Sequence, residues 1–354
     1  MSLLHSDSFD DRPITAIGDR YSAHQYNVSA ASGIYPGRTG NGLGLSTGIL
    51  DVADHITWES ANTHQSIYVG IAWEQGYQSG ALCSIRYNGT AQIFAQLNTD
   101  RTISIIRFDS GANTVLATST QTVPTTPLTT FFYVEFYAKI SPTVGAYELR
   151  IDGVRWLSAS GVNTSTTGGS LANQVRVTNL SSAADGAYSI VDDFYIADDD
   201  TDDGNATLIG FAGPVKIACR IPTGAGASSE WTPLSGANYT NVDDPASTGK
   251  DGDTSYVASL TDGAVDVYAH DALEVVNPTI VTVAVHQWAR KVDGTTRTIT
   301  PIAYVSSTEY QGNETSLGVS YARVFHGFDT NPATGIAWTR AQVSSAQFGV
   351  MLGS

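Results

Sequence analysis

Short runs of alternating hydrophobic and polar residues dominate this chain. In the clearest run, Phe131–Ile140, every second residue from Phe132 onward is apolar, whereas Glu135 and Lys139 fall on the opposite face. Because side chains of a strand alternate between two faces, this period of two predicts a half-buried antiparallel strand and not a helix. The run Ala146–Ile151 alternates in the same way and ends at an Asp-Gly pair, which is typical of a hairpin turn.

Similar runs recur through the first half of the chain, with Asn-Gly, Asp-Gly and Gly-Gly turn signals between them. Many short strands at this spacing predict a β-sandwich or a barrel. Residues 28–48 are rich in Gly, Ser and Thr, and we expect them to form loops. The further strands predicted in this half are Ser66–Glu74, Leu82–Tyr87, Ala91–Asn98, Thr102–Asp109 and Ser189–Ala197.

An acidic segment, Asp198–Asn205, separates this half from the rest of the chain. Like charges repel one another and stay solvated, and Gly and Asn interrupt regular structure, so we interpret the segment as a linker. It divides the chain into two predicted domains, residues 1–200 and 206–354. The alternating pattern restarts at Val215.

The acidic segment could also bind a cation. A calcium loop of the EF-hand type needs Gly at its sixth position and Glu at its twelfth. Counted from Asp198, Gly204 falls one place late and the twelfth residue is Ile209, so this motif fails. A surface cation held loosely by the cluster Asp198–Asp203 stays an alternative to the hydrated linker.

The second half has the same pattern. Pro222–Thr254 is predicted to be a long loop. Thr339 and Gln342 have the spacing of a capping box, which predicts one short helix, Arg340–Ala346. The predicted fold class is therefore all-β, with two β-sandwich (jelly-roll) domains and one short helix near the C-terminus. The strands predicted here are Val215–Ile221, Ser255–Ser259, Val265–Ala269, Thr279–Val292, Arg297–Val305, Ser320–Phe328 and Gln347–Leu352.

Composition supports a globular protein and excludes two classes of partner. The chain has 354 residues, of which 42% are hydrophobic and 15% charged, enough for two cores and too apolar for disorder. Its formal net charge of -16 repels phosphate backbones and anionic lipids. We therefore expect no nucleic acid and no membrane as partner, and no apolar run reaches the ~20 residues of a membrane span.

The first residues and the cysteines bear on the cellular compartment. The start, Met1–Asp10, has neither the basic region nor the apolar core of a signal peptide, so we expect synthesis in a cytoplasm without ordinary export. Cys83 and Cys219 are the two cysteines, and each falls in a predicted strand. We interpret them as buried free thiols, although a bridge between the two halves stays open.

The sequence has no residues at the spacings that define catalytic or metal-binding motifs. The seven histidines are scattered without a ligand pair, so we expect no metal site and no cofactor. Glycoside hydrolysis needs two carboxylates in defined positions, and the candidate glutamates are isolated and interpreted as surface residues. We therefore expect no catalytic residues and no enzyme activity, although acids from distant strands could converge in space. These glutamates are Glu59, Glu74, Glu135 and Glu148.

Aromatic residues suggest a possible ligand. The chain has 17 Tyr and 6 Trp, and glycan-binding modules hold sugar rings against exposed aromatic side chains beside Asp and Asn. Trp231 and Tyr239 lie in the long predicted loop together with Asp243 and Asp244, so these four residues are a candidate glycan-binding site. The alternative is that Trp and Tyr fill the corners of a sandwich core.

The chain resembles two known groups of proteins. The strands around Asp152-Gly153, followed by the late strand Val191–Ile196, resemble the concanavalin A-like, laminin G-type jelly roll. The segments Asp251–Ser259 and Asn331–Thr339 look like a recurring C-terminal module in structural proteins of tailed bacteriophages. The opening His5–Asp10 fits the same group, and together the resemblance covers most of the chain.

The resemblance implies a non-enzymatic virion structural protein, most readily a tail-fibre or tail-tip component that could bind a host receptor glycan. It further implies partners: copies of the chain itself, with a homotrimer expected, other virion proteins, and host surface polysaccharide. Two alternatives stay open, a capsid decoration protein and a glycan-active depolymerase. The depolymerase fits the jelly-roll fold but lacks the paired carboxylates of a glycan hydrolase.

Overall fold

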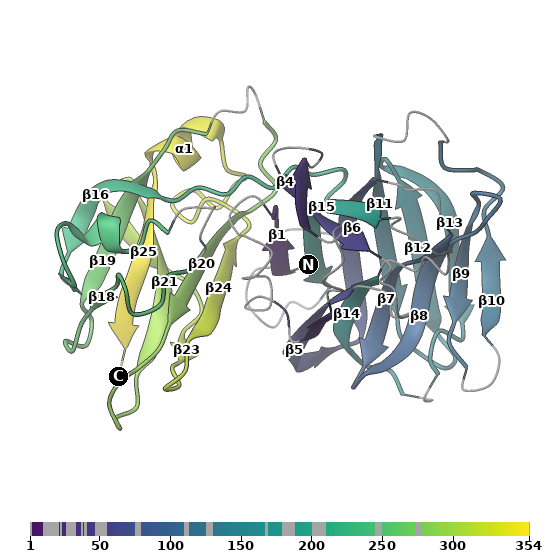
Figure 1. Cartoon of the computed structure of the whole chain (residues 1–354), viewed down its shortest axis with the longest axis horizontal. Coiled ribbons are helices and arrows are strands. Elements are labelled where there is room, and N and C mark those ends of the chain that lie inside the picture. The colour runs from purple at the N-terminus through teal and green to yellow at the C-terminus, as the bar shows by residue number, and fades with distance from the viewer. Residues whose placement is uncertain are drawn as a thin grey trace. The chain divides into compact units, whose positions relative to one another are not determined.

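The computed structural model describes most of the chain as antiparallel β-structure (Figure 1). It divides into two compact units, the first extending to Ala218 and the second beginning at Cys219. The all-β fold class is confirmed. The described residues are 2–9, 21, 23–25, 33–36, 38, 41–46, 55–74, 79–109, 113–124, 130–166, 169–178, 188–199, 210–244, 250–273 and 278–353.

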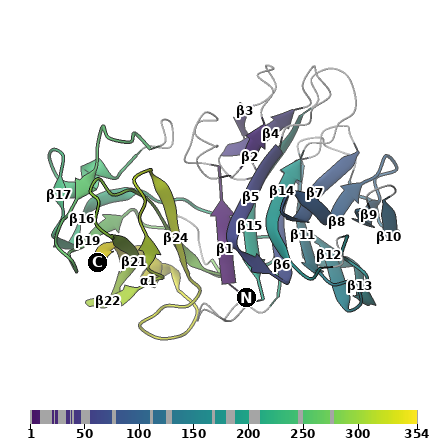
Figure 2. The same cartoon turned by 90° about the horizontal axis from the view of Figure 1, so that it is seen from below.

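The described strands of unit 1 form two antiparallel sheets. The eight-stranded sheet has the order β13-β12-β11-β6-β15-β4-β3, with β1 beside β15; Figure 2 shows β6, β11, β12 and β13 in succession. Its strands are β1 (Ser2–Asp7), β3 (Gly33–Pro36), β4 (Asn41–Ser46), β6 (Ser66–Glu74), β11 (Phe131–Lys139), β12 (Gly145–Ile151), β13 (Val154–Val162) and β15 (Tyr188–Asp198).

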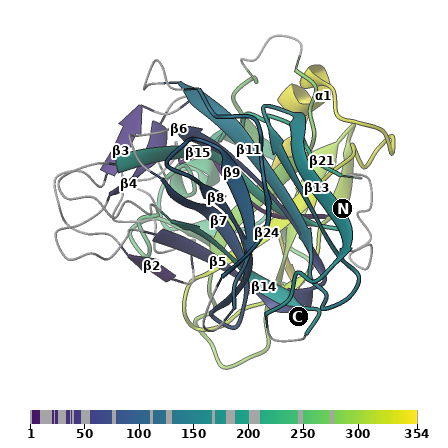
Figure 3. The same cartoon turned by 90° about the vertical axis from the view of Figure 1, so that its right-hand side faces the viewer.

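The seven-stranded sheet has the order β10-β9-β8-β7-β14-β5-β2. Figure 3 shows β7, β8 and β9 side by side in this sheet. Its strands are β2 (Ala23–Gln25), β5 (His55–His64), β7 (Gly80–Tyr87), β8 (Thr90–Leu97), β9 (Ile103–Arg107), β10 (Thr114–Thr118) and β14 (Ala172–Thr178).

The core of unit 1 consists of the apolar residues that face each other between the two sheets. Val134 and Phe136 of β11 belong to one buried cluster with Ile93 and Ile105 of the opposite sheet. Each such side chain is removed from water, which contributes about 1.5–3 kcal/mol of stabilisation. The period-two pattern predicted this arrangement, and the predicted strand Ser66–Glu74 has the same bounds as β6.

Several strands of unit 1 escaped the sequence pattern. Residues 28–48, predicted to be loops, contain β3 and β4. In β4, Leu43 and Leu45 are fully buried and alternate with glycines, so the strand has only two apolar side chains to reveal its period. Strands β5, β10, β13 and β14 were not predicted either, and the turn expected at Gly168-Gly169 lies partly outside the described residues.

The division between the units comes later in the chain than the predicted start at residue 206. Val215–Ile221, predicted to be a strand, forms no ladder; Val215 and Ile217 instead pack on the outer face of the eight-stranded sheet of unit 1. Asp198, assigned to the linker, is the buried last residue of β15. Residues 200–205 of the predicted linker lie outside the described residues.

The described strands of unit 2 form a six-stranded sheet, order β16-β19-β25-β21-β22 with β23 beside β21, and two strand pairs, β17–β18 and β20–β24. The elements are β16 (Pro222–Ser229), β17 (Thr232–Pro233), the 3-10 helix η2 (Asn238–Asn241), β18 (Val257–Ala258), β19 (Val265–His270), β20 (Val283–Ala289), β21 (Thr298–Val305), β22 (Thr308–Gln311), β23 (Thr315–Ser316), β24 (Ala322–Phe328), α1 (Arg340–Ser345) and β25 (Gln347–Gly353).

The short helix of unit 2 was predicted correctly. Thr339 caps α1, its side chain accepting the Gln342 backbone N–H while the Gln342 side chain accepts the Thr339 backbone N–H, so the capping box is confirmed. The predicted loop Pro222–Thr254 is wrong in part, because its first residues form strand β16. This strand consists of small residues without an apolar period, so the sequence pattern did not reveal it. Cys83 is buried as expected, but Cys219 is exposed, which contradicts the prediction for that thiol.

No helix among the described residues is long and apolar enough to cross a membrane.

We expect Gly70→Ala to destabilise unit 1. Gly70 of β6 pairs with Tyr195 of β15, and a Cβ at position 70 would overlap the Tyr195 ring. Overpacking of this kind costs about 1–3 kcal/mol, which chemical denaturation would measure. Gly224→Ala is the matched control, since its Cβ would meet Ala269 at 3.6 Å, an ordinary contact. Equal effects of the two substitutions would contradict the packing described.

Candidate functional site

Polar and aromatic side chains gather on the outer face of the eight-stranded sheet, the face that points away from the core of unit 1. Because β11 alternates, its odd-numbered residues lie on this face, and the ladder places Glu135 between Gly70 of β6 and Arg150 of β12. Tyr137 is likewise flanked by Tyr68 and Glu148. We call this surface the tyrosine face: Tyr68, Tyr133, Glu135, Tyr137, Glu148, Arg150 and Tyr195.

Glu135 is buried, which corrects its interpretation as a surface residue. Its Oε1 accepts hydrogen bonds from the Tyr195 hydroxyl at 3.0 Å and the Gly213 backbone N–H at 2.7 Å. Its Oε2 has no hydrogen-bond partner among the described residues. Burial raises the pKa of this carboxyl, and the two hydrogen bonds oppose the rise only in part.

A segment at the end of unit 1 covers the buried part of the tyrosine face. We call residues 211–217 the covering segment. Its backbone N–H groups at Ala212 and Ile217 donate to the Tyr195 hydroxyl at 3.2 Å and to Asp193 Oδ1 at 2.7 Å. Arg38 pairs with Asp193 at 3.1 Å and also donates to the Val215 carbonyl oxygen at 2.6 Å. Backbone N–H groups of the covering segment thus donate hydrogen bonds to buried carboxylate and phenol oxygens on the outer face of the sheet.

The other part of the tyrosine face is only half-buried. The Tyr68 and Tyr137 rings lie 4.5 Å apart between centroids, and Phe211 meets Tyr68 edge-on at 5.3 Å. The Arg150 guanidinium lies 4.3 Å from the centre of the Phe211 ring and donates to Glu148 at 2.7 Å. Three aromatic rings, a carboxylate and a guanidinium therefore border one surface.

Burial keeps the phenols of this surface protonated. It raises the pKa of Tyr68 to about 12, with the neighbouring Tyr137 adding to the rise, and it also raises the pKa of Tyr137. Near neutral pH both hydroxyls are therefore neutral and can act as donors and acceptors. The arrangement can hold a ring-shaped ligand with an apolar face and hydroxyl groups along its edge.

The residues predicted to contact a glycan lie in unit 2. Trp231 is half-buried, its indole N–H donates to the Ala264 carbonyl oxygen at 3.0 Å, and its ring packs against a buried cluster that includes Ile299. Tyr239 belongs to η2, and Asp243 and Asp244 follow that helix. Trp231 is therefore anchored in the core, as the alternative interpretation had it, and binding at these four residues stays a prediction.

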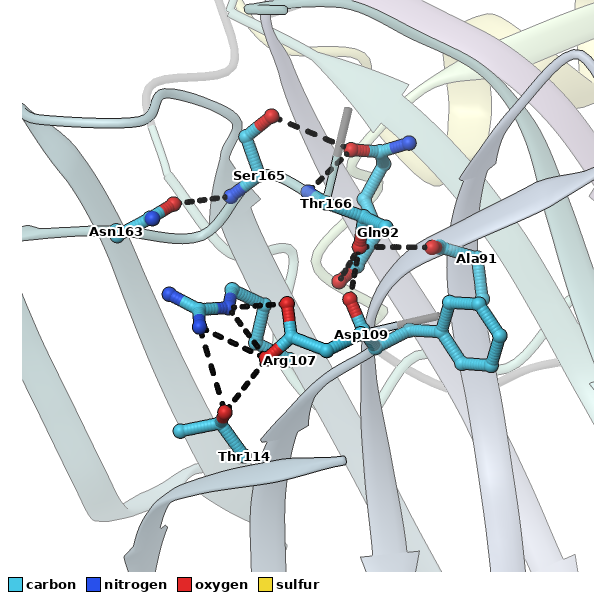
Figure 4. A network of polar contacts seen from close by, with 9 residues as sticks. Ala91, Gln92, Arg107, Asp109, Thr114, Asn163, Ser165 and Thr166 are labelled. Carbon is cyan, nitrogen blue, oxygen red and sulfur yellow. Dashed lines mark hydrogen bonds and ion pairs between the residues drawn. The ribbon is translucent and has the colours of Figure 1, made fainter. Parts of the chain in front are cut away.

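A polar network on the other sheet serves the scaffold of unit 1 (Figure 4). Gln92 is fully buried, and its side-chain oxygen accepts the Thr166 backbone N–H at 2.9 Å. The Thr166 hydroxyl donates to backbone carbonyl groups of β8 and of the segment after β9. Nearby, hydrogen bonds from Arg107 and Thr114 lower the pKa of Asp109. These contacts attach the segment around Thr166 to the sheet.

Within the described part of the chain, no three His, Cys, Asp or Glu side chains converge so that they could hold a metal ion. Most of the cluster Asp198–Asp203 lies outside that part. Cation binding at this cluster stays a prediction.

Comparison with known proteins found similar solved structures only. No family model and no curated protein matches the chain. A glucuronan lyase from the fungus Trichoderma reesei is 11% identical, with a TM-score of 0.39, over 53% of this chain and 94% of its own. An alginate lyase from a Chlorella virus is 6% identical, with a TM-score of 0.41, over 55% and 99%. A sialidase is 10% identical, with a TM-score of 0.41, over 58% and 19%.

These comparisons contradict the prediction that the chain is not an enzyme, because the similar structures include several polysaccharide lyases. We withdraw that prediction. At these identities the likeness concerns the β-sandwich fold, and the assignment of an activity has to rest on the residues of this chain. The comparisons contain no phage virion protein, so the resemblance to tailed-phage structural proteins stays a prediction.

We expect the stability of unit 1 to depend on the protonation of Glu135. Burial raises the folded-state pKa of this carboxyl above 4.5. The protonated carboxyl therefore contributes to the free energy of unfolding fully below pH 4.5, and this contribution is lost as pH rises through the folded-state pKa. Glu135→Gln should abolish this component of the pH dependence. Unfolding free energies of variant and wild type across this range measure it.

Tyr195→Phe provides the opposite change. The Tyr195 hydroxyl lowers the pKa of Glu135 through its hydrogen bond, so its removal should raise that pKa further and steepen the loss of stability with pH. Identical pH profiles for wild type and Glu135→Gln would contradict the account of this buried pair.

Proposed function

We propose that this chain is a glycan-binding, glycan-active β-sandwich protein whose ligand lies on the tyrosine face of unit 1. The observation that carries the proposal is the half-buried Tyr68–Tyr137 pair beside Arg150 and Glu148. The glucuronan and alginate lyases named above act on polysaccharides, in agreement with the proposal. The proposal rests on the surface itself.

The chemistry of the surface suits a sugar ring. The C–H faces of a pyranose are apolar and pack on aromatic rings, which recover the energy of apolar burial. Its hydroxyl groups need partners in fixed directions, and the carboxylate of Glu148 and the guanidinium of Arg150 supply an acceptor and a fork of donors. Arg150 would also pair with the carboxylate of an acidic sugar.

Glu135 and Tyr195 supply the groups for proton transfer. A carboxyl with a raised pKa keeps its proton to a higher pH than an ordinary glutamate and can exchange it with a neighbouring group, as polysaccharide cleavage requires. The Gly213 N–H and the Tyr195 hydroxyl occupy Glu135 Oε1 in this structure. Cleavage at Glu135 therefore requires the covering segment to move aside, whereas binding at Tyr68 and Tyr137 does not.

Binding is tested first with the aromatic pair. We expect Tyr137→Ala to weaken binding of the polysaccharide that an array of neutral and acidic polysaccharides identifies, by at least about tenfold, or ~1.4 kcal/mol. Calorimetric titration measures it. Tyr87→Ala is the matched control, since Tyr87 ends β7 in the other sheet and is half-buried too. An equal loss in both variants, or no bound polysaccharide, would count against the tyrosine face.

Cleavage is tested on the same polysaccharide. Light scattering after size separation follows its chain length during incubation with the purified chain. We expect progressive shortening that Glu135→Gln removes while binding persists. Shortening that continues at the full rate in Glu135→Gln would exclude this carboxyl from the reaction, and an unchanged length with wild type would leave a binding protein without the activity.

The finer proposal, carried by the sequence resemblance alone, is that the chain is a tail-fibre or tail-tip component of a tailed bacteriophage that binds host surface polysaccharide. Antibody labelling of purified particles under the electron microscope tests its place in the virion. Light scattering of the purified chain tests the proposed homotrimer.

A further inference from the structure

Three residues from two sheets form a chain of hydrogen bonds at one edge of unit 1. His64 Nδ1 lies 2.6 Å from Asp198 Oδ2, and His64 Nε2 lies 3.1 Å from the Ser60 hydroxyl oxygen. Ser60 and His64 belong to β5 of the seven-stranded sheet, and Asp198 ends β15 of the eight-stranded sheet. None of the three takes part in the tyrosine face.

A wide irregularity in β5 makes this contact possible. The ladder to β14 pairs Glu59 with Gln174 and then His64 with Ala172, so more residues lie on the β5 side than on the β14 side. The intervening residues 60–63 leave the ladder, which brings Ser60 back toward His64. Bulges of this kind redirect side chains and are frequent next to active sites.

The order of the three groups is that of a nucleophile, a general base and the residue that orients the base. The tautomer that satisfies both contacts has its proton on Nδ1, donated to the Asp198 carboxylate, and leaves Nε2 to accept the Ser60 hydroxyl proton. A serine hydroxyl becomes nucleophilic when an adjacent base can remove its proton in this way.

In this group the base and the residue that orients it are buried, whereas the nucleophile is partly exposed. The side chains of His64 and Asp198 are 6% and 4% exposed, so their interaction is shielded from water. Ser60 is only half-buried and lies next to exposed residues of the bulge, where a substrate can reach it. Asp198 Oδ1 has no partner among the described residues. A buried carboxylate held by one oxygen is well placed to stabilise the imidazolium that forms on His64.

We propose that Ser60, His64 and Asp198 form a catalytic site for the hydrolysis of acyl esters. Ser60 Oγ attacks the ester carbonyl carbon while its proton passes to His64 Nε2, and the collapsing tetrahedral intermediate expels the alcohol, which takes that proton. The acyl group stays on Ser60. Water then attacks the acyl carbon and gives one proton to His64 Nε2. The second tetrahedral intermediate breaks its bond to Ser60 Oγ, which takes that proton back from His64, and the carboxylic acid is released.

A backbone group of the bulge contacts Ser60. The Asn62 backbone N–H donates to Ser60 Oγ at 3.0 Å, which fixes the hydroxyl and stabilises negative charge on it.

The proposed class of ester is an acyl group on a glycan hydroxyl. Tyr68 follows His64 by four residues on the same stretch of chain, and at about 3.3 Å per residue the two lie within roughly 13 Å of each other. We propose that the glycan is long enough to extend from the tyrosine face past this end of the sheet to Ser60. This choice of substrate rests on the proposed function, whereas the triad does not.

The triad is tested with small probes. We expect the intact chain to hydrolyse p-nitrophenyl acetate and to be labelled at Ser60 by a fluorophosphonate, as peptide mass spectrometry would show. Ser60→Ala should abolish both, and His64→Gln should lower the rate at least about hundredfold. Ser158→Ala, at an exposed serine of β13, is the control and should keep the full rate.

Asp198→Asn separates an orienting role from a merely structural one. If Asp198 orients His64, the folded variant should lose rate and shift the pH profile of hydrolysis, with circular dichroism confirming the fold. Absence of label on Ser60 in the wild-type chain, or a Ser60→Ala rate equal to that of the wild type, would overturn the proposal. Labelling of the wild type needs no variant, so a His64→Gln chain that fails to fold leaves the test intact.

The glycan ester has a separate test. Release of acetate from O-acetylated polysaccharide, measured with wild type, Ser60→Ala and Tyr137→Ala, should be lost in the first variant and reduced in the second. Hydrolysis of p-nitrophenyl acetate without acetate release would retain the triad and overturn the glycan ester as substrate. Acetate release unchanged in Tyr137→Ala would retain the ester and count against the tyrosine face.

Discussion

The hydrogen bonds between the covering segment and the buried acids of the eight-stranded sheet are the interaction on which the organisation of unit 1 depends. The alternation of β11 that turns Phe136 into the core necessarily turns Glu135 onto the outer face. A buried carboxylate without partners is strongly destabilising. Gly213 and Ile217 supply backbone N–H groups to Glu135 and Asp193, so the chain covers this face with its own backbone.

That covering divides the outer face into two parts with different roles. Beneath the covering segment Glu135 is buried, this burial raises the pKa of its carboxyl, and its Oε1 accepts a hydrogen bond from the Tyr195 hydroxyl. The part beside Phe211 stays half-open, and there Tyr68 and Tyr137 offer ring faces to a ligand. The proposed ligand-binding region and the buried Glu135–Tyr195 pair thus lie on the same face of one sheet.

The sequence alone predicted the strands that have a clear apolar period. It also predicted the short helix, because its capping residues are close together in the chain. It identified Ser66–Glu74 with its correct bounds and the capping box of Thr339. It missed β4, where glycines alternate with Leu43 and Leu45, and β16, which consists of small residues. In both strands the ladder holds the backbone in place, and the side chains contribute little pattern.

The candidate sites depend on contacts between distant parts of the chain, which spacing could not reveal. Glu135 looked like a surface residue because the residues that bury it begin at Phe211, beyond an acidic segment. His64 and Asp198 are 134 positions apart, and Asp198 was assigned to the linker. The sequence shows that Tyr133, Glu135 and Tyr137 share one face of their strand. It does not show that Tyr68 and Arg150 lie beside them, because that depends on the register between neighbouring strands.

The most direct test of the central claim, that a glycan binds on the tyrosine face, is hydrogen exchange of the intact chain with and without the bound polysaccharide. We expect slower exchange in peptides from β6, β11 and β12 and unchanged exchange in peptides from β7, β8 and β9. Protection confined to unit 2 around Trp231 and Tyr239 would contradict this account and favour the site predicted from the sequence.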